Sequence, residues 1–125
     1  MFPEKRLPTS ALVVDDNDDT REFVGKILTN QGCQVHFARD GEQALSMARN
    51  LRPEVVYLDV NMPQQDGWLV CAKLKYFPLA PVVVLMTGMD RDNLYRFAEF
   101  VKADDVLRKP FSPDDVIESL PFLSA

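Results

Sequence analysis

The sequence is poor in cysteine and histidine. It has two cysteines, Cys33 and Cys71, and one histidine, His36. No CxxC pair occurs and no histidine stands at zinc-ligand spacing, which argues against a disulfide framework and a Cys/His zinc site. Both cysteines lie in apolar segments, so we expect reduced core residues. His36 alternates along a predicted edge strand, where we expect an exposed side chain.

Long hydrophobic runs and basic clusters are also missing. The longest apolar run, Pro81–Met86, is far shorter than the roughly 20 residues of a membrane-spanning helix. The first ten residues lack the apolar core of a secretory signal. No stretch gathers Lys and Arg as a nucleic-acid-binding segment does. These absences favour a cytoplasmic protein that contacts neither membrane nor nucleic acid directly.

The rest of the composition is typical of one globular domain. The chain has 125 residues, 46% hydrophobic and 26% charged, with a net charge of −5. A chain of this length can build its own core. Pro3 and Pro8 predict an irregular lead-in over 1–9, and we expect the domain itself over 10–125.

Strand and helix patterns alternate five times along the chain. Strands are expected at 10–14, 33–38, 55–58, 81–86 and 106–107. Helical spacing of apolar residues comes after each strand, near 18–31, 41–52, 66–77, 94–101 and 113–120. The alternation predicts an α/β fold: a flavodoxin-like (βα)5, doubly wound parallel five-stranded sheet with helices on both faces.

The strand patterns also indicate the order of the sheet. The first, third and fourth strands are continuous apolar runs, which is typical of central strands covered on both faces. The second alternates and the fifth is very short, which is typical of edges. The order 2-1-3-4-5 satisfies both observations.

Polar side chains stand after the strands, where the sheet should bind a ligand. Asp15 and Asp16 follow the first strand, Asp59 the third, Thr87 the fourth and Lys109 the fifth. In open α/β sheets, ligands bind beyond the carboxyl ends of the strands, at the reversal of strand order. That reversal lies between the first and third strands. We therefore expect these five side chains to meet at one rim.

Three carboxylates at one rim repel each other and favour a bound cation. Mg²⁺ prefers a few carboxylates together with water and phosphate oxygens. Lys109 adds a second positive charge and Thr87 a hydroxyl donor. A carboxylate in these surroundings suits phosphoryl transfer, with the carboxylate attacking phosphorus.

Four stretches with matching order and spacing carry a family resemblance. They are LVVDDN (12–17), YLDVNMPQQDG (57–67), LMTG (85–88) and ADDVLRKPF (103–111). With them, the sequence resembles the receiver domain of two-component response regulators, of the single-domain, CheY-like kind. The resemblance covers nearly the whole chain.

The resemblance implies a phosphoprotein of a two-component phosphorelay. Asp59 would accept a phosphoryl group from a phosphohistidine of a histidine kinase or histidine phosphotransfer protein, forming an aspartyl phosphate. Asp16, the Asp59 carboxylate and the backbone carbonyl of Asn61 would hold Mg²⁺, with Asp15 contributing through water. The expected catalysis is limited to self-directed phosphotransfer and autodephosphorylation, so the chain would not be an ordinary enzyme.

The same resemblance implies how the signal leaves the domain. Lys109, joined to Pro110 by a cis bond, would bind a phosphoryl oxygen, and Thr87 would hydrogen-bond the phosphoryl group. The phosphorylated form would then favour contact with an unidentified downstream protein. We expect a monomer or weak dimer.

Three positions depart from the family pattern. Val106 stands where receivers usually carry the aromatic residue that rotates inward with Thr87. Lys102 stands at a tight turn that commonly uses glycine. Pro121 cuts the last helix short, which makes a dimer along its full length less expected.

Other interpretations remain open. A phosphorylation-independent scaffold on the same fold is motivated by Val106. A receiver fragment of a hybrid histidine kinase would have a similar sequence. A phosphohydrolase with an aspartate nucleophile is disfavoured, because Asn61 stands where such enzymes carry a second, proton-donating Asp. Trp68 either packs locally or marks a contact.

Overall fold

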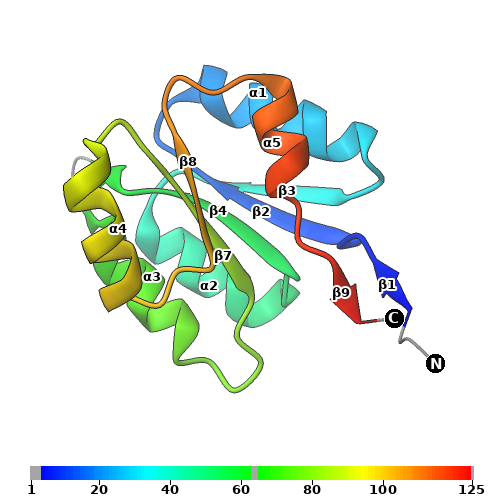
Figure 1. Cartoon of the computed structure of the whole chain (residues 1–125). Helices are drawn as coiled ribbons and strands as arrows, with labels where there is room; N and C mark the ends of the chain where they lie inside the picture. Colours follow the sequence, from blue (N-terminus) through cyan, green and yellow to red (C-terminus); the bar gives the residue numbers. More distant parts are fainter. Residues whose placement is uncertain (1–3, 63–64, 125) are drawn as a thin grey trace.

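Parallel strands form the centre of the molecule in the computed structural model, which describes residues 4–62 and 65–124 (Figure 1). They are β2 (Ser10–Val14), β3 (Gln34–Ala38), β4 (Val55–Asp59), β7 (Val82–Thr87) and β8 (Asp105–Arg108). Their order in the sheet is β3-β2-β4-β7-β8, with every neighbouring pair parallel. The predicted flavodoxin-like α/β fold and the order 2-1-3-4-5 are therefore confirmed.

Helices cover both faces of this sheet. One face carries α1 (Asp18–Asn30) and α5 (Pro113–Ser119), and the other carries α2 (Gly41–Leu51), α3 (Gly67–Lys75) and α4 (Arg91–Phe100) (Figure 1). Among the described residues, no helix has the length and apolar character needed to cross a bilayer.

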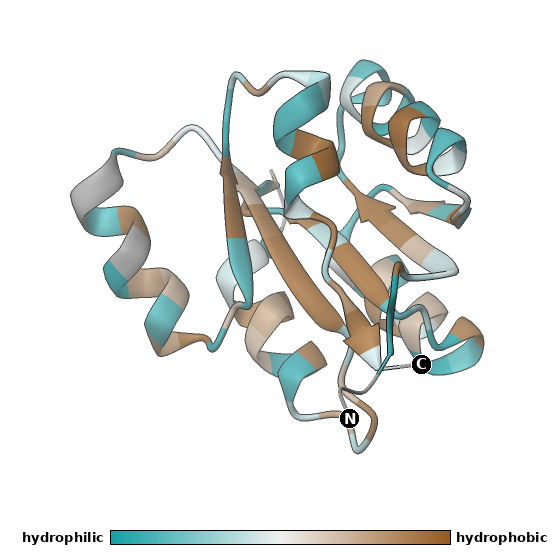
Figure 2. Ribbon diagram, turned by 45° about the vertical axis from the view of Figure 1, so that its right-hand side comes forward, coloured by the Kyte–Doolittle hydropathy of each residue, from teal (hydrophilic) through white to brown (hydrophobic). Residues whose placement is uncertain are grey.

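Alternate residues of the central strands enter two separate cores. Val13 and Tyr57 pack with residues of α1 and α5, whereas Leu12 and Leu58 pack with residues of α2 and α3. Because both faces are covered, every residue of β4 is buried. Figure 2 shows the strands as a hydrophobic centre between more polar helices. The continuous apolar runs are thus the sequence signature of double coverage.

Capping side chains define where the helices begin. Asn17, Asp40, Asp66, Asp90 and Ser112 each accept a hydrogen bond from a backbone N–H of the first helical turn. Such caps satisfy donors that have no partner within the helix. Ser112 and Asp115 form a reciprocal capping box, and α5 ends at Ser119, before Pro121, as predicted.

The prediction of an irregular lead-in over 1–9 was wrong for two residues. Lys5–Arg6 forms β1, which pairs antiparallel with β9 (Leu123–Ser124) at the other end of the chain. An ion pair between distant positions fixes this segment: Arg6 donates to both carboxylate oxygens of Glu54 at 2.9 and 2.5 Å. The hydrogen bonds from Arg6 lower the pKa of Glu54 to about 2. A strand of two residues has no periodicity to detect.

Two smaller expectations also need correction. The predicted loop after β4 contains a short hairpin, β5 (Asn61–Met62) and β6 (Gln65–Asp66); positions 63–64 of that loop lie outside the described residues. The His36 side chain is half-buried rather than exposed, because α1 and α2 both contact the edge strand β3. The prediction of reduced core cysteines is confirmed, since both are buried and unpaired.

Lys102 makes the turn before β8 with a backbone suited to glycine. Its φ angle is +61°, in the left-handed region that costs a non-glycine residue roughly 1–2 kcal/mol. Its side chain is exposed. The turn therefore contains local backbone strain.

We predict that Lys102→Gly raises the free energy of unfolding by about 0.5–1 kcal/mol, because relief of strain exceeds the extra entropy of glycine in the unfolded chain. Urea denaturation measures the change. Lys102→Ala, which removes the same side chain but keeps the strain, is the control and should give no such gain. Equal stabilisation by both variants would refute the explanation.

Candidate functional site

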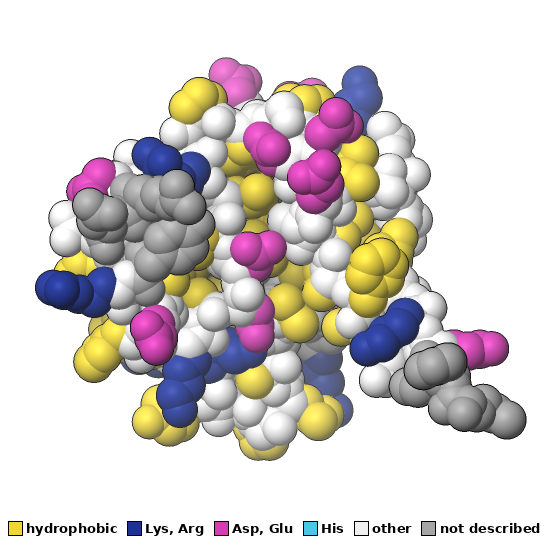
Figure 3. All heavy atoms as spheres, viewed as in Figure 1, with side chains coloured by type: hydrophobic (Ala, Val, Ile, Leu, Met, Phe, Trp, Pro, Cys, Tyr) yellow, Lys and Arg dark blue, Asp and Glu magenta, His cyan; other side chains and the backbone are white. Residues whose placement is uncertain are grey.

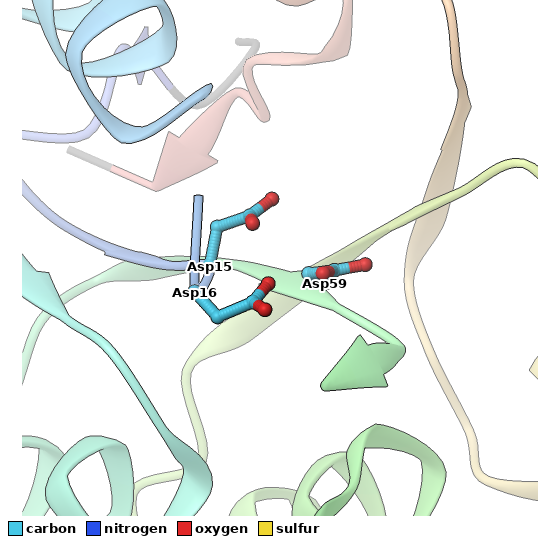
Figure 4. Close-up of side chains that lie close together, drawn as sticks. All are labelled: Asp15, Asp16 and Asp59. Atoms are coloured by element: carbon cyan, nitrogen blue, oxygen red, sulfur yellow. The ribbon is translucent and has the colours of Figure 1, made fainter. Parts of the chain in front are cut away.

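Three carboxylates meet beyond the ends of β2 and β4. Asp15 and Asp16 directly follow β2, and Asp59 is the last residue of β4 (Figure 4). One carboxylate oxygen of each lies within 4.8 Å of the others. Asp15 and Asp59 are only 0% and 2% exposed, whereas Asp16 is exposed. The convergence expected from the strand ends is present, and it places two of the three charges inside the protein.

Lys109 is the cation that faces the two buried carboxylates, Asp15 and Asp59. Its Nζ lies 3.1 Å from Asp15 Oδ2 and 3.5 Å from Asp59 Oδ1. Burial raises the pKa of Asp15, and the nearby Asp59 raises it further, while the Asn17 N–H and Lys109 act in the opposite direction. One ammonium therefore leaves the buried acids only partly compensated.

Thr87 completes the predicted rim at the end of β7. Its side chain is fully buried, and its Oγ1 accepts a hydrogen bond from the Met89 N–H at 3.0 Å. A hydroxyl that accepts in this way still has its own hydrogen to donate. The Thr87 carbonyl accepts from the Lys109 N–H at 2.7 Å. The backbone thus ties Thr87 to Lys109, and the Lys109–Pro110 bond is cis, as expected.

Asn61 approaches Asp59 through its backbone. The Asn61 N–H donates to Asp59 Oδ1 at 3.1 Å, and its side chain is exposed. This hydrogen bond orients the Asp59 carboxylate. The use of the Asn61 carbonyl as a metal ligand stays a prediction.

Arg21 is a site residue that sequence reasoning missed. It is 8% exposed, donates to the Asp15 carbonyl at 2.6 Å, and forms an ion pair with Asp18. It therefore holds the backbone of the loop that carries the first two carboxylates. Its spacing from Val24 and Leu28 would have placed it on the buried face of α1.

Gly67 is the second missed position, although it closes the YLDVNMPQQDG stretch. A Cβ atom at Gly67 would lie 2.4 Å from Val60 Cα and 2.6 Å from the Asp59 carbonyl oxygen. Only glycine lets α3 start this close to the backbone that follows Asp59. The residue acts by close approach of two backbones.

The donor set fits a hard divalent cation. All candidate ligands are oxygens, two of the carboxylates are buried, and the third opens to solvent, where water can complete the coordination. Mg²⁺ suits such a site because it keeps several waters and uses few carboxylates. The same arrangement, with Lys109 opposite, suits stabilisation of phosphoryl oxygens beside a carboxylate nucleophile.

Val106, the departure in β8, lies half-buried against the α2–α4 side of the core. A branched aliphatic side chain fills this place instead of a ring that could swing between two positions. Trp68 is half-buried, and its ring centroid lies 5.5 Å from that of Phe97 on α4.

Comparison with known sequences identifies the family that the chain resembles along most of its length. The model of the response regulator receiver domain family matches residues 11–121. Response regulator MprA of Mycobacterium sp. strain KMS is 35% identical over 111 residues, covering 89% of this chain and 48% of that protein. The chain thus spans about half the length of such relatives. Protein PilG of Pseudomonas aeruginosa is 32% identical over 114 residues, covering 87% of this chain and 82% of PilG.

Solved structures show the same architecture. The chemotaxis response regulator CheY4 of Vibrio cholerae superimposes with a TM-score of 0.82 at 28% identity, covering 89% of this chain and 94% of that one. A BeF₃-activated DrrB receiver domain gives a TM-score of 0.79 at 28% identity, covering 87% and 91%.

We predict that Asp15→Asn stabilises the cation-free protein near neutral pH, because burial and the nearby Asp59 disfavour the charged form of Asp15. The folded-state pKa of Asp15 lies above its unfolded value, so the native protein loses stability as pH rises through that interval. The advantage of the variant should therefore shrink as pH falls below the usual range of aspartate. Urea denaturation in EDTA at several pH values measures it.

The matched control is Asp114→Asn, which removes an exposed carboxylate from the first turn of α5. This variant should show no gain at neutral pH. Loss of stability in Asp15→Asn at neutral pH without metal would contradict the cost assigned to burial of the Asp15 charge beside Asp59.

Proposed function

Because the chain belongs to the family of response regulator receiver domains, we propose that Asp59 accepts a phosphoryl group from a phosphohistidine of a histidine kinase or phosphotransfer protein. The main support is the position of Asp59: a buried carboxylate at the end of a central strand, 3.5 Å from the Lys109 ammonium and grouped with Asp15 and Asp16. The two unpaired cysteines favour the cytoplasm as the compartment.

The proposed transfer is an in-line displacement at phosphorus. Asp59 Oδ1 accepts from the Asn61 N–H, which leaves Oδ2 to attack. The Oδ2–P bond forms as the N–P bond of the phosphohistidine breaks, and the leaving imidazole takes a proton. Asp16, Asp59 and the Asn61 carbonyl, with Asp15 through water, would hold Mg²⁺, which supplies positive charge to the phosphoryl oxygens.

Lys109 and Thr87 respond to the new charge. Lys109 lies between Asp15 and Asp59, so its ammonium can turn to a phosphoryl oxygen as the Asp59 charge is used in the new bond. Thr87 would donate its hydroxyl hydrogen to another oxygen. Such a movement alters the hydrogen bond that Thr87 Oγ1 accepts from the Met89 N–H. Met89 lies two residues before the start of α4. The segment 87–90 is therefore where phosphorylation biases the conformation.

Incubation with acetyl phosphate and Mg²⁺ is expected to add one phosphoryl group, seen as an increase of about 80 Da in intact mass. Asp59→Asn should abolish the adduct, because the nucleophile is lost. EDTA should reduce it strongly, because the charge on the phosphoryl oxygens is no longer compensated. Asp114→Asn removes an exposed carboxylate that is not part of the acidic cluster, so this variant should be phosphorylated normally. An adduct that persists in Asp59→Asn would sink the proposal.

Val106 supports a second candidate, a scaffold whose contacts ignore phosphorylation. Its half-buried aliphatic side chain offers no aromatic group to transmit movement of Thr87 to the surface. The two functions differ in what phosphorylation does after it occurs.

A titration of BeF₃⁻ with Mg²⁺, monitored by backbone amide spectra, separates them. For the signalling receiver we expect shifts that extend from residues 87–90 into α4 and β8. Shifts confined to residues in contact with the Asp59 pocket favour the scaffold. Val106→Tyr should then extend the shifts to β8, because it supplies the missing ring; the conservative variant Val106→Ile should not.

A further inference from the structure

A surface with both basic and apolar side chains lies near the amino ends of the strands, opposite the acidic rim. It is the basal pocket, formed by the end of α2 and the connection from α3 to β7. Its lining residues are Ala48, Arg49, Arg52, Phe77, Pro78 and Leu79. The connection enters β7 at its amino end, whereas Thr87 ends the same strand. Six residues of strand separate the pocket from the acidic rim by roughly 17–20 Å.

The basal pocket is open and apolar at its centre. It has a volume of about 180 Å³, and an apolar cavity of about 150 Å³ already accommodates a benzene molecule. It can therefore take one aliphatic or aromatic side chain. Leu79 on its wall is 77% exposed, and the adjacent Tyr76 is 90% exposed. The connection that forms the wall of the pocket therefore presents large apolar side chains to solvent.

The edges of the pocket are positively charged. The Arg49 guanidinium lies 5.6 Å from the centre of the Phe77 ring, and Arg52 is exposed. Among the described side chains, neither arginine forms an ion pair. The neighbouring carboxylates of Glu54 and Asp104 are bound to Arg6 and Lys75. Figure 3 shows Lys and Arg beside hydrophobic side chains in the lower part of the molecule, and a group of Asp and Glu over α5 in the upper part.

The backbone conformation of Arg52 also indicates a role for this residue outside the domain's own packing. Arg52 caps α2 with φ 49° and ψ 57°, a left-handed conformation that glycine or asparagine adopts more easily. An arginine there costs roughly 1–2 kcal/mol. The side chain makes no hydrogen bond among the described residues that offsets this cost within the domain.

We propose that the basal pocket docks an acidic segment of a partner protein. One apolar side chain of the segment enters the pocket against Phe77 and Leu79, and flanking carboxylates pair with Arg49 and Arg52. The occupant is assigned by charge complementarity, since the pocket offers cations without carboxylate partners among the described residues. Because the pocket is remote from Asp59, docking is independent of phosphorylation and goes beyond the proposed function. It would keep the domain at its partner in both states.

Fluorescence anisotropy with labelled acidic decapeptides tests the proposal. Each peptide carries Asp and Glu around a central Leu, Phe or Trp. At least one peptide should bind the intact protein saturably and more weakly as salt rises. Arg49→Glu with Arg52→Glu should weaken binding at least about tenfold, because attraction becomes repulsion. Lys26→Glu with Arg96→Glu, two exposed cations on α1 and α4, makes the same charge change elsewhere and should leave binding intact.

A second variant separates the apolar contact from the charges. Leu79→Ser alters one exposed side chain and should weaken binding of the Leu, Phe and Trp peptides while leaving a peptide with central Ser unchanged. Circular dichroism melts confirm that each variant is folded. No binding by any peptide, or equal binding after reversal of both arginines, overturns the proposal.

The remaining outcomes distinguish other occupants. Affinity should be equal with and without BeF₃⁻ and in Asp59→Asn; a change would overturn the independence from phosphorylation. Failure of Asp59 to accept phosphate would leave docking unaffected, so the two proposals fail separately. If the arginine variant loses only binding to phosphatidylglycerol vesicles, the occupant is a membrane surface. If it loses only self-association, the occupant is a second copy of this chain. Either outcome would overturn the assignment to an acidic partner segment.

Discussion

The structure depends on one electrostatic constraint: two buried carboxylates share one ammonium. Reversal of strand order between β2 and β4 brings Asp15 and Asp59 together, and Lys109 reaches both. Such a pair is costly in a domain whose total stability is only about 5–15 kcal/mol. Much of the surrounding structure serves to maintain it, including the Arg21 contact with the Asp15 carbonyl and the close approach of Gly67 to Asp59.

The sheet separates two kinds of chemistry along its strands. The rim at the carboxyl ends of the strands is acidic and partly buried, which suits a small, strongly charged group that must be shielded from water. The basal pocket near the amino ends of the strands is apolar and flanked by arginines, which suits a larger, flexible peptide segment. Because the sheet lies between the rim and the basal pocket, both sites can be occupied at once without steric competition.

Features that depend on periodicity and on the ends of strands could be predicted from the sequence. Continuous apolar runs identified central strands, and Asp15, Asp59 and Lys109 could be placed together because parallel strands end at the same edge. Contacts between distant residues that do not stand at the ends of the predicted strands were not predictable. Arg6 and Glu54 are 48 positions apart, and nothing local to either indicates the pairing that orders β1. The half-buried His36 likewise depends on how α1 and α2 cover β3.

The pairing of β1 with β9 has a consequence for how the domain can be joined to other chains. Lys5 lies opposite Ser124, so the described ends of the chain emerge side by side, at the edge remote from the acidic rim (Figure 1). A domain with adjacent ends can be inserted into a surface loop of a host protein without stretching that loop, and its ends can be closed by a short linker for circular permutation. The antiparallel pairing thus makes the domain a self-contained module that can be transplanted with its acidic rim facing outward.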